Sequence, residues 1–267
     1  MSSLSDYLED KLLDHLLRNT AYSKPATLYF ALFTSDPGES GVSGEVSGGS
    51  YARASATNDN VRFPACSASG TPTKTNGTII TFPTATAAWG TITHWAVYDA
   101  SSGGTNMLAH GALATSRVVA SGDTPRLAAG AVSLTMSNAV SGGLTDFAKR
   151  KLLDHVFGGP SYTPPATIYT GLGTALSGET LTEWGDSSYT RQATAFDAPS
   201  GGACVNTSAE QYSASVADAA VTLTHFGVWD DSGAGNLLAV GPLGSSRSIV
   251  LTDTVDLQDS NLSVSLL

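Results

Sequence analysis

The sequence predicts a mainly β protein with two tandem homologous antiparallel β-sandwich domains, each carrying an N-terminal α-helix. Three observations support this prediction. The chain of 267 residues repeats itself at a spacing of about 135 residues. Charged residues make up only 13% of it, about half of the globular average, while Gly, Ser, Thr and Ala are abundant. Short alternating segments are separated by turn residues, as in antiparallel sheets.

The repeat runs the full length of the chain. Residues 11–36, KLLDHLLRNTAYSKPATLYFALFTSD, recur as residues 151–176, KLLDHVFGGPSYTPPATIYTGLGTAL. The offset between the copies falls along the chain through 140, 138, 131 and 130 residues. Loops absorb changes of length and packed elements do not, so each step marks a loop in the second copy.

A period of this length indicates a duplicated domain, because solenoid repeats span about 20–50 residues. The segment SNAVSGGLTD carries the Ser-Gly-Gly sequence of a connection between a strand and the next helix. We therefore expect two domains, residues 1–140 (copy 1) and residues 141–267 (copy 2).

Each copy opens with an amphipathic helix. In copy 1, Ser5 is the expected N-cap and Arg18 and Asn19 close the helix. In copy 2, Thr145 is the expected N-cap, and Gly158-Gly159 ends the helix. A single apolar stripe implies that each helix lies against a sheet. The stripe of the first helix comprises Leu4, Tyr7, Leu8, Leu12 and Leu16.

The segments that follow predict strands. ATLYFALFT is apolar on both faces, which is typical of a central strand. The other expected strands are short and bounded by turn residues: GTIITF, TITHWAVYD and AVSLTMS in copy 1, and VTLTHFGVWD, NLLAVGPL, SIVLTD and NLSVSLL in copy 2.

The charge balance bears on possible partners. The chain has 13 Lys and Arg against 23 Asp and Glu, a formal net charge of −10, which argues against binding to a nucleic-acid backbone. The N-terminus has no positively charged n-region and does not predict a signal peptide. No apolar stretch approaches the roughly 18–20 residues of a membrane helix. We therefore expect synthesis in a cytosol and no membrane partner.

Two cysteines are too few for a disulfide framework in that compartment. Cys66 and Cys204 each follow the Tyr of a Tyr-x-Arg sequence by 15 residues, so we expect them to occupy matching positions. A small half-buried side chain used twice is the simpler interpretation. A bond between copies or between chains is the alternative.

Carboxylates and arginines recur at equal spacing around Tyr51 and Tyr189. Each tyrosine has a glutamate six residues before it and an arginine two residues after it. Such a pair could be catalytic, but structural ion pairs are the more common use. The candidate structural ion pairs are Glu45 with Arg53, Glu183 with Arg191, Arg117 with Asp123, and Arg247 with Asp253.

Candidate chemistry beyond these pairs is weak. His94 and His225 stand in Thr-His-aromatic sequences without the spacing of metal ligands, so half-exposed strand histidines are expected, with a metal ligand or a general acid or base as alternatives. The Asp230-Asp231-Ser232-Gly233 turn could hold calcium, but only one of its carboxylates recurs in copy 1. No nucleophile, dinucleotide or phosphate motif is present. The sequence therefore predicts no enzyme, no cofactor and no bound metal.

The segments LSDYLEDKLLDHLLRNTAYSKPATLYFALFTSDPGESG, EVSGGSYAR and GTITHWAVYDASSGGTNMLAHGALATS resemble a family of bacteriophage virion proteins, usually labelled tail fibre or minor tail protein. Members are typically single-domain. Copy 1 matches almost throughout, whereas copy 2 departs at GLGTALSGETLTEWGDSSYTR, where the Asp-Pro-Gly turn is lost.

The resemblance implies a non-catalytic structural protein of the virion, made in the host bacterial cytoplasm. We expect it to be tail-associated, of fibre, minor tail or baseplate type, and to contact other virion proteins. Three duplicated chains would present six similar units, so a homo-oligomer, specifically a trimeric pseudo-hexamer, is expected. Capsid decoration is one alternative. A carbohydrate-binding adhesin for host recognition is another, with Trp89 and Trp184 as possible glycan contacts.

Overall fold

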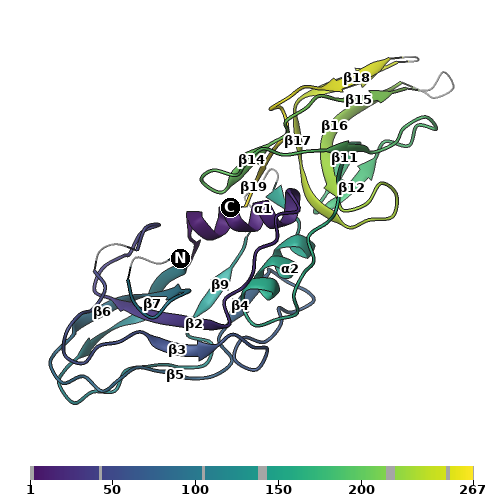
Figure 1. Cartoon of the computed structure of the whole chain (residues 1–267). Helices are drawn as coiled ribbons and strands as arrows, with labels where there is room; N and C mark the ends of the chain where they lie inside the picture. Colours follow the sequence, from purple (N-terminus) through teal and green to yellow (C-terminus); the bar gives the residue numbers. More distant parts are fainter. Residues whose placement is uncertain are drawn as a thin grey trace. The chain divides into compact units, whose positions relative to one another are not determined.

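The computed structural model describes residues 3–41, 44–103, 106–137, 143–214, 220–250 and 253–266 (Figure 1). The chain forms two compact units, and each unit combines the strands of one copy with the helix end of the other. Unit 1 consists of Met1–Glu9, Ser23–Met136 and Arg150–Tyr162, and unit 2 consists of Asp10–Tyr22, Ser137–Lys149 and Thr163–Leu267. The domain boundary between residues 140 and 141 divides the two sequence copies, and it stays a prediction.

Unit 1 is built on a five-stranded antiparallel sheet in the order β1-β7-β6-β2-β3. The predicted central strand is confirmed, because β2 pairs with β6 on one side and β3 on the other. Two further antiparallel pairs, β4-β9 and β5-β8, complete the unit. The strands are β1 Ser3–Leu4, β2 Thr27–Phe33, β3 Ala54–Thr57, β4 Thr73–Thr75, β5 Ile80–Thr81, β6 Gly90–Tyr98, β7 Met107–Val119, β8 Arg126–Leu127 and β9 Ser133–Thr135.

Unit 2 repeats the plan with β10-β17-β16-β11-β12, and β13 also pairs with β11. The pairs β14-β19 and β15-β18 correspond to β4-β9 and β5-β8. The prediction of a mainly β chain with two tandem antiparallel domains is thus confirmed. The strands are β10 Gly143–Leu144, β11 Ile168–Ser177, β12 Thr180–Glu183, β13 Gln192–Thr194, β14 Ala203–Val205, β15 Glu210–Ser213, β16 Val221–Trp229, β17 Leu237–Ile249, β18 Thr254–Leu257 and β19 Ser263–Ser265.

The two helices, α1 (Asp6–Leu17) and α2 (Asp146–Val156), begin at the predicted N-caps. The Leu8 N–H donates to Ser5 Oγ at 3.3 Å, and the Ala148 N–H donates to Thr145 Oγ1 at 3.3 Å. Beyond the helix ends, Asn19 and Gly158 have φ angles of 51° and 73°, the left-handed conformation that stops a helix.

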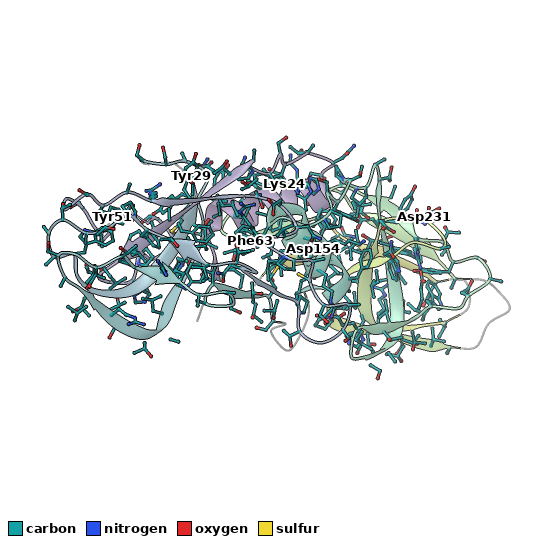
Figure 2. All side chains as sticks on the ribbon, turned by 90° about the horizontal axis from the view of Figure 1, so that it is seen from below. Lys24, Tyr29, Tyr51, Phe63, Asp154 and Asp231 are labelled. Atoms are coloured by element: carbon teal, nitrogen blue, oxygen red, sulfur yellow. The ribbon has the colours of Figure 1, made fainter. Side chains whose placement is uncertain are left out.

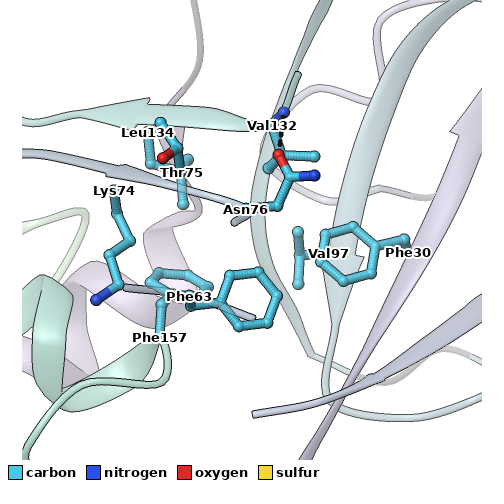
Figure 3. Close-up of a pocket in the computed structure, with 9 residues that line it drawn as sticks. All are labelled: Phe30, Phe63, Lys74, Thr75, Asn76, Val97, Val132, Leu134 and Phe157. Atoms are coloured by element: carbon cyan, nitrogen blue, oxygen red, sulfur yellow. Dashed lines mark hydrogen bonds between the residues drawn. The ribbon is translucent and has the colours of Figure 1, made fainter. Parts of the chain in front are cut away.

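The core of unit 1 lies on both faces of its main sheet. On one face, Phe30 and Val97 line a small cavity together with residues of β4, β9 and the chain after α2 (Figure 3). The Phe30 and Phe63 rings stack there, with centroids 6.0 Å apart. On the other face, Phe33 and Tyr98 belong to a second buried cluster. Both faces are therefore covered, as the apolar sequence of β2 predicts.

The longest hairpin of each unit contains the same irregularity. The pairing of β6 with β7 shifts between Ile92↔Arg117 and His94↔Ala112, and the pairing of β16 with β17 shifts in the same way. Three extra residues in the longer strand produce this shift, so it is a bulge larger than the usual insertion of one residue. Most residues of β7 and β17 from the bulge onward are exposed, but the last residue of each strand, Val119 and Ile249, is buried.

Candidate functional site

A hydrogen-bonded polar group of unit 1 joins Glu45, Tyr51 and Arg53. Arg53 Nε and Nη2 donate to Glu45 Oε1 and Oε2, each at 2.8 Å. The two parallel hydrogen bonds make this a bidentate pair, the strongest geometry available to an arginine and a carboxylate. The Arg53 side chain is only 5% exposed, so it depends on Glu45 for its counter-charge.

Tyr51 (Figure 2) connects this ion pair to the main sheet. Its hydroxyl donates to Glu45 Oε1 at 3.0 Å and accepts the Leu32 N–H at 3.0 Å. Burial, followed by the nearby Glu45 carboxylate, raises the pKa of Tyr51 far above its ordinary value. The phenol therefore stays protonated near neutral pH and serves as a structural donor.

Unit 2 contains the same cluster at equivalent positions. Arg191 donates to both oxygens of Glu183 at 2.8 Å. The Tyr189 hydroxyl donates to Glu183 Oε1 at 2.9 Å and accepts the Leu172 N–H at 2.8 Å. Burial, followed by Glu183, raises the pKa of Tyr189. We call each group of three residues the Glu–Tyr–Arg cluster.

An aromatic ring lies beneath each arginine. The Arg53 guanidinium carbon lies 3.6 Å from the centre of the Tyr98 ring, and that of Arg191 lies 4.0 Å from the centre of the Trp229 ring. The arginines also bind the following hairpin turn, through Ala100 O and Asp231 O, each at 3.0 Å. The cluster thus joins three segments of its unit: the glutamate strand, the main sheet and the hairpin turn.

The second set of predicted ion pairs has different partners. The Asp123 carboxylate accepts the Ala120 N–H at 2.8 Å, and that of Asp253 accepts the Val250 N–H at 3.1 Å. Within the described ranges, no ion pair joins Arg117 to Asp123 or Arg247 to Asp253, and both arginines are exposed. These aspartates close turns because a turn leaves backbone N–H groups that a short carboxylate can reach.

The possible glycan contacts require a correction. Trp89 and Trp184 are buried, with 5% and 4% of their surfaces exposed, so neither indole has a face open to a sugar ring. Trp89 packs edge-on against Tyr51 at 5.2 Å between ring centroids, and its Nε1–H donates to Gly49 O at 3.0 Å. Trp184 packs against Tyr189 at 5.3 Å. Both indoles therefore support a Glu–Tyr–Arg cluster.

The strand histidines are half-buried. Thr93 Oγ1 lies 2.8 Å from His94 Nδ1, and Thr224 Oγ1 lies 2.7 Å from His225 Nδ1. In unit 1 alone, the Asp36 carboxylate approaches His94 Nε2 at 3.9 Å and His110 Nδ1 at 3.5 Å. No group of three or more His, Cys, Asp or Glu side chains suited to a metal ion occurs among the residues with assigned positions.

The cysteine expectation is wrong about the matching positions. Cys204 pairs with Val264 in β14-β19, which is the register of Lys74 with Leu134 in β4-β9. Cys204 therefore corresponds to Lys74 and not to Cys66. Both thiols are free. Burial is the main cause that raises the pKa of each to about 12.

The fold and the repeated cluster define a tandem β-rich module whose polar side chains are used to hold loops. In the described part of the chain, neither helix is long and apolar enough to cross a membrane.

A family model described as podophage GP4 fiber I protein gp80 matches residues 3–135 and again residues 143–265. The two matches cover most of the chain, with one match in each copy. The chain therefore belongs to this family of podophage fibre-type virion proteins, as the sequence resemblance predicts. No curated protein matches the chain.

Proposed function

We propose that the protein is a non-catalytic, tail-associated structural component of the virion that assembles through its two β-rich copies as a trimer. The observation that carries this proposal is the repetition of the Glu–Tyr–Arg cluster in both units of a fibre-family chain. The same internal support in each copy would let one chain present two similar surfaces. Three such chains form a closed pseudo-sixfold ring, which suits the symmetry of a tail.

The exposed parts of β7 and β17 are the proposed contacts between chains. Strand β7 pairs with β1 only at Ala109 and His110, so no described strand covers the rest of its outer edge. Val118 on this strand is 72% exposed, and Val250, just after β17, is 55% exposed. Uncovered edges with apolar side chains are suited to pairing with another copy of the chain.

Mass measurement of the native assembly tests the proposed trimer. We expect three chains per particle, and a monomer or dimer would refute the trimer. The double variant Val118→Lys with Val250→Lys should dissociate the assembly, because lysines on an edge oppose strand pairing. Val61→Lys is the matched control, since Val61 is 73% exposed and belongs to neither β7 nor β17. Equal behaviour of the double variant and the control would exclude these edges as the contact.

An image of the intact particle tests the location. A few copies at the tail support the proposal, whereas hundreds of copies over the capsid would assign the protein to capsid decoration instead. The buried positions of Trp89 and Trp184 remove the feature that favoured a carbohydrate-binding adhesin.

A further inference from the structure

Each compact unit contains the helix end of the opposite copy. Residues Arg150–Tyr162 belong to unit 1, and residues Asp10–Tyr22 belong to unit 2. The two helix ends, RKLLDHVFGG and DKLLDHLLRN, have apolar residues at the same positions, although Val156 and Phe157 replace Leu16 and Leu17, so the pattern of the apolar stripe does not determine which sheet each one covers. The polar residues of the two helix ends differ, and these differences determine which unit each helix end fits.

The first difference lies one turn into each helix. Arg150 donates to the Gly70 carbonyl oxygen in unit 1, whereas Asp10 Oδ1 accepts the Gly202 N–H at 2.9 Å in unit 2. The residue equivalent to Gly202 is Pro72, because their carbonyl groups accept the N–H groups of Leu266 and Met136, the residues that follow β19 and β9. Proline has no N–H. An aspartate in place of Arg150 would therefore lack this donor in unit 1.

The second difference concerns the aspartate that both helices share. Asp154 (Figure 2) binds Lys74 Nζ at 2.7 Å, and the Lys74 side chain is 1% exposed. The Cys66 N–H also donates to Asp154, at 2.8 Å. In unit 2 the position of Lys74 is occupied by Cys204, which has no positive charge. There Asp14 obtains its cation from Arg18, four residues further along the chain and just after α1.

The third difference is the residue just after each helix. Arg18 Nε donates to Phe196 O at 3.2 Å in unit 2. The equivalent residue of copy 2 is Gly158, which has a φ of 73° and fits closely against unit 1. A Cβ at Gly158 would overlap Asp59 O and lie 2.7 Å from Phe63 Cβ. Unit 1 therefore has no room for an arginine at this position.

Each of these three differences matches a helix end to the unit in which it lies. A return of α1 to the strands of copy 1 would bring Arg18 onto the Asp59 backbone and Asp10 onto Pro72. A return of α2 to the strands of copy 2 would place Asp154 beside Cys204, and Gly158 would not supply the missing cation. A buried carboxylate without a counter-charge is strongly unfavourable.

We infer that the strands of each copy form a recognition surface specific for the helix end of the opposite copy, so that the chain folds as an obligate pair of exchanged copies. The recognised partner is a helix end of defined chemistry: Arg150, Asp154 and Gly158 for unit 1, and Asp10, Asp14 and Arg18 for unit 2. The inference does not depend on the proposed oligomer or on its place in the virion.

A double-mutant cycle on the full chain tests which aspartate Lys74 meets. Lys74→Met and Asp154→Asn should each lower the urea midpoint, and their effects should be non-additive because they remove the same ion pair. Asp14→Asn is the matched control from the other helix, and its effect should add to that of Lys74→Met. Coupling of Lys74 to Asp14, with additivity toward Asp154, would overturn the inference.

A second experiment on the full chain tests the glycine. Gly158→Arg, which gives copy 2 the residue of copy 1, should reduce soluble yield and the urea midpoint. Gly178→Arg is the control, because Gly178 has a φ of 60° and open space around its Cβ position. It carries the same backbone strain without the overlap. A larger loss for Gly158→Arg supports the inference, and equal losses for the two variants would overturn it.

Discussion

The two copies keep the same polar cluster but support it with different apolar residues. In copy 1 the indole against the cluster tyrosine comes from Trp89, and the position equivalent to Trp184 is Val46. In copy 2 the indole comes from Trp184, and the position equivalent to Trp89 is Ala220. One large and one small residue have changed places, so each unit retains a ring against its tyrosine.

The two copies also differ in the size of the ring beneath the arginine and in the size of the residues around that ring. Tyr98 of copy 1 lies among Ala31 and Ala96, whereas Trp229 of copy 2 lies beside Gly171 and Gly227. A Cβ on Gly171 would lie 3.0 Å from the Trp229 ring, and one on Gly227 would overlap it. The larger ring therefore requires the smaller neighbours, as volume conservation in a packed core demands.

The comparison separates two kinds of constraint. Both copies keep the three residue types of the Glu–Tyr–Arg cluster, because its hydrogen bonds require these particular donor and acceptor groups. The apolar support needs only the correct total volume, so it can be supplied from either of two segments. Removal of the cluster should therefore cost both copies similar free energy, whereas removal of an indole should be repairable.

The largest expected effect is the loss of a cluster glutamate. Glu45→Ala leaves the buried Arg53 without a counter-charge, and we expect it to lower the free energy of unfolding by about 3–5 kcal/mol. Glu183→Ala should give a slightly smaller loss, because the Arg191 side chain is 10% exposed against 5% for Arg53. Urea unfolding of each variant measures the difference. A loss in one copy but not in the other would contradict the shared role of the cluster.

The next effect concerns the exchanged indoles. Trp184→Val removes the ring against Tyr189, and we expect it to lower the free energy of unfolding by about 3 kcal/mol, through lost burial and a residual cavity. Adding Ala220→Trp rebuilds the arrangement of copy 1 and should recover part of the loss.

The control for this repair is Ala220→Trp alone, which should destabilise because both indoles then compete for one space. Urea unfolding of the three variants gives their coupling. If Ala220→Trp lowers stability equally with and without Trp184, the two positions do not share a site and the exchange is refuted.

Much of this architecture follows from local sequence patterns. The capping residues Ser5 and Thr145, the central strand and the proximity of Glu45 to Arg53 each depend on residues a few positions apart, or on an alternation within one strand. The role of the Tyr51 hydroxyl was missed, although the tyrosine stands at the same place in both copies. That recurrence was the available signal.

The exchange of helix ends could not be predicted from the repeat. Both helices present the same apolar stripe, so hydrophobic patterning fits either sheet equally. The discriminating residues, such as Lys74 and Cys204, are distant in sequence from the helices that they meet. Equal spacing from Tyr51 and Tyr189 predicts that Cys66 and Cys204 match, and this prediction is wrong. The loops after the two tyrosines differ in length, so only the strand register identifies equivalent residues.

The smallest expected effect is a pH dependence confined to unit 2. Ile80 of β5 has Glu210 as its equivalent in β15, since they pair with Leu127 and Leu257. Burial is the main cause that raises the pKa of Glu210 from 4.5 to about 6. The unfolded chain therefore loses this proton first, so the contribution of Glu210 to stability should fall as pH rises from about 4.5 to about 6 and stay constant above that range. The expected fall is roughly 2 kcal/mol.

Glu210→Gln keeps the shape of the side chain and cannot titrate, so it isolates this contribution. The difference in unfolding free energy between wild type and variant, measured by urea unfolding from pH 4 to pH 7, should grow in favour of the variant by roughly 2 kcal/mol. The Asn206 Nδ2 donor, 3.2 Å from Glu210 Oε2, remains able to bind the glutamine oxygen. A difference that stays constant across this range would show that the buried carboxyl does not titrate there and would contradict this prediction.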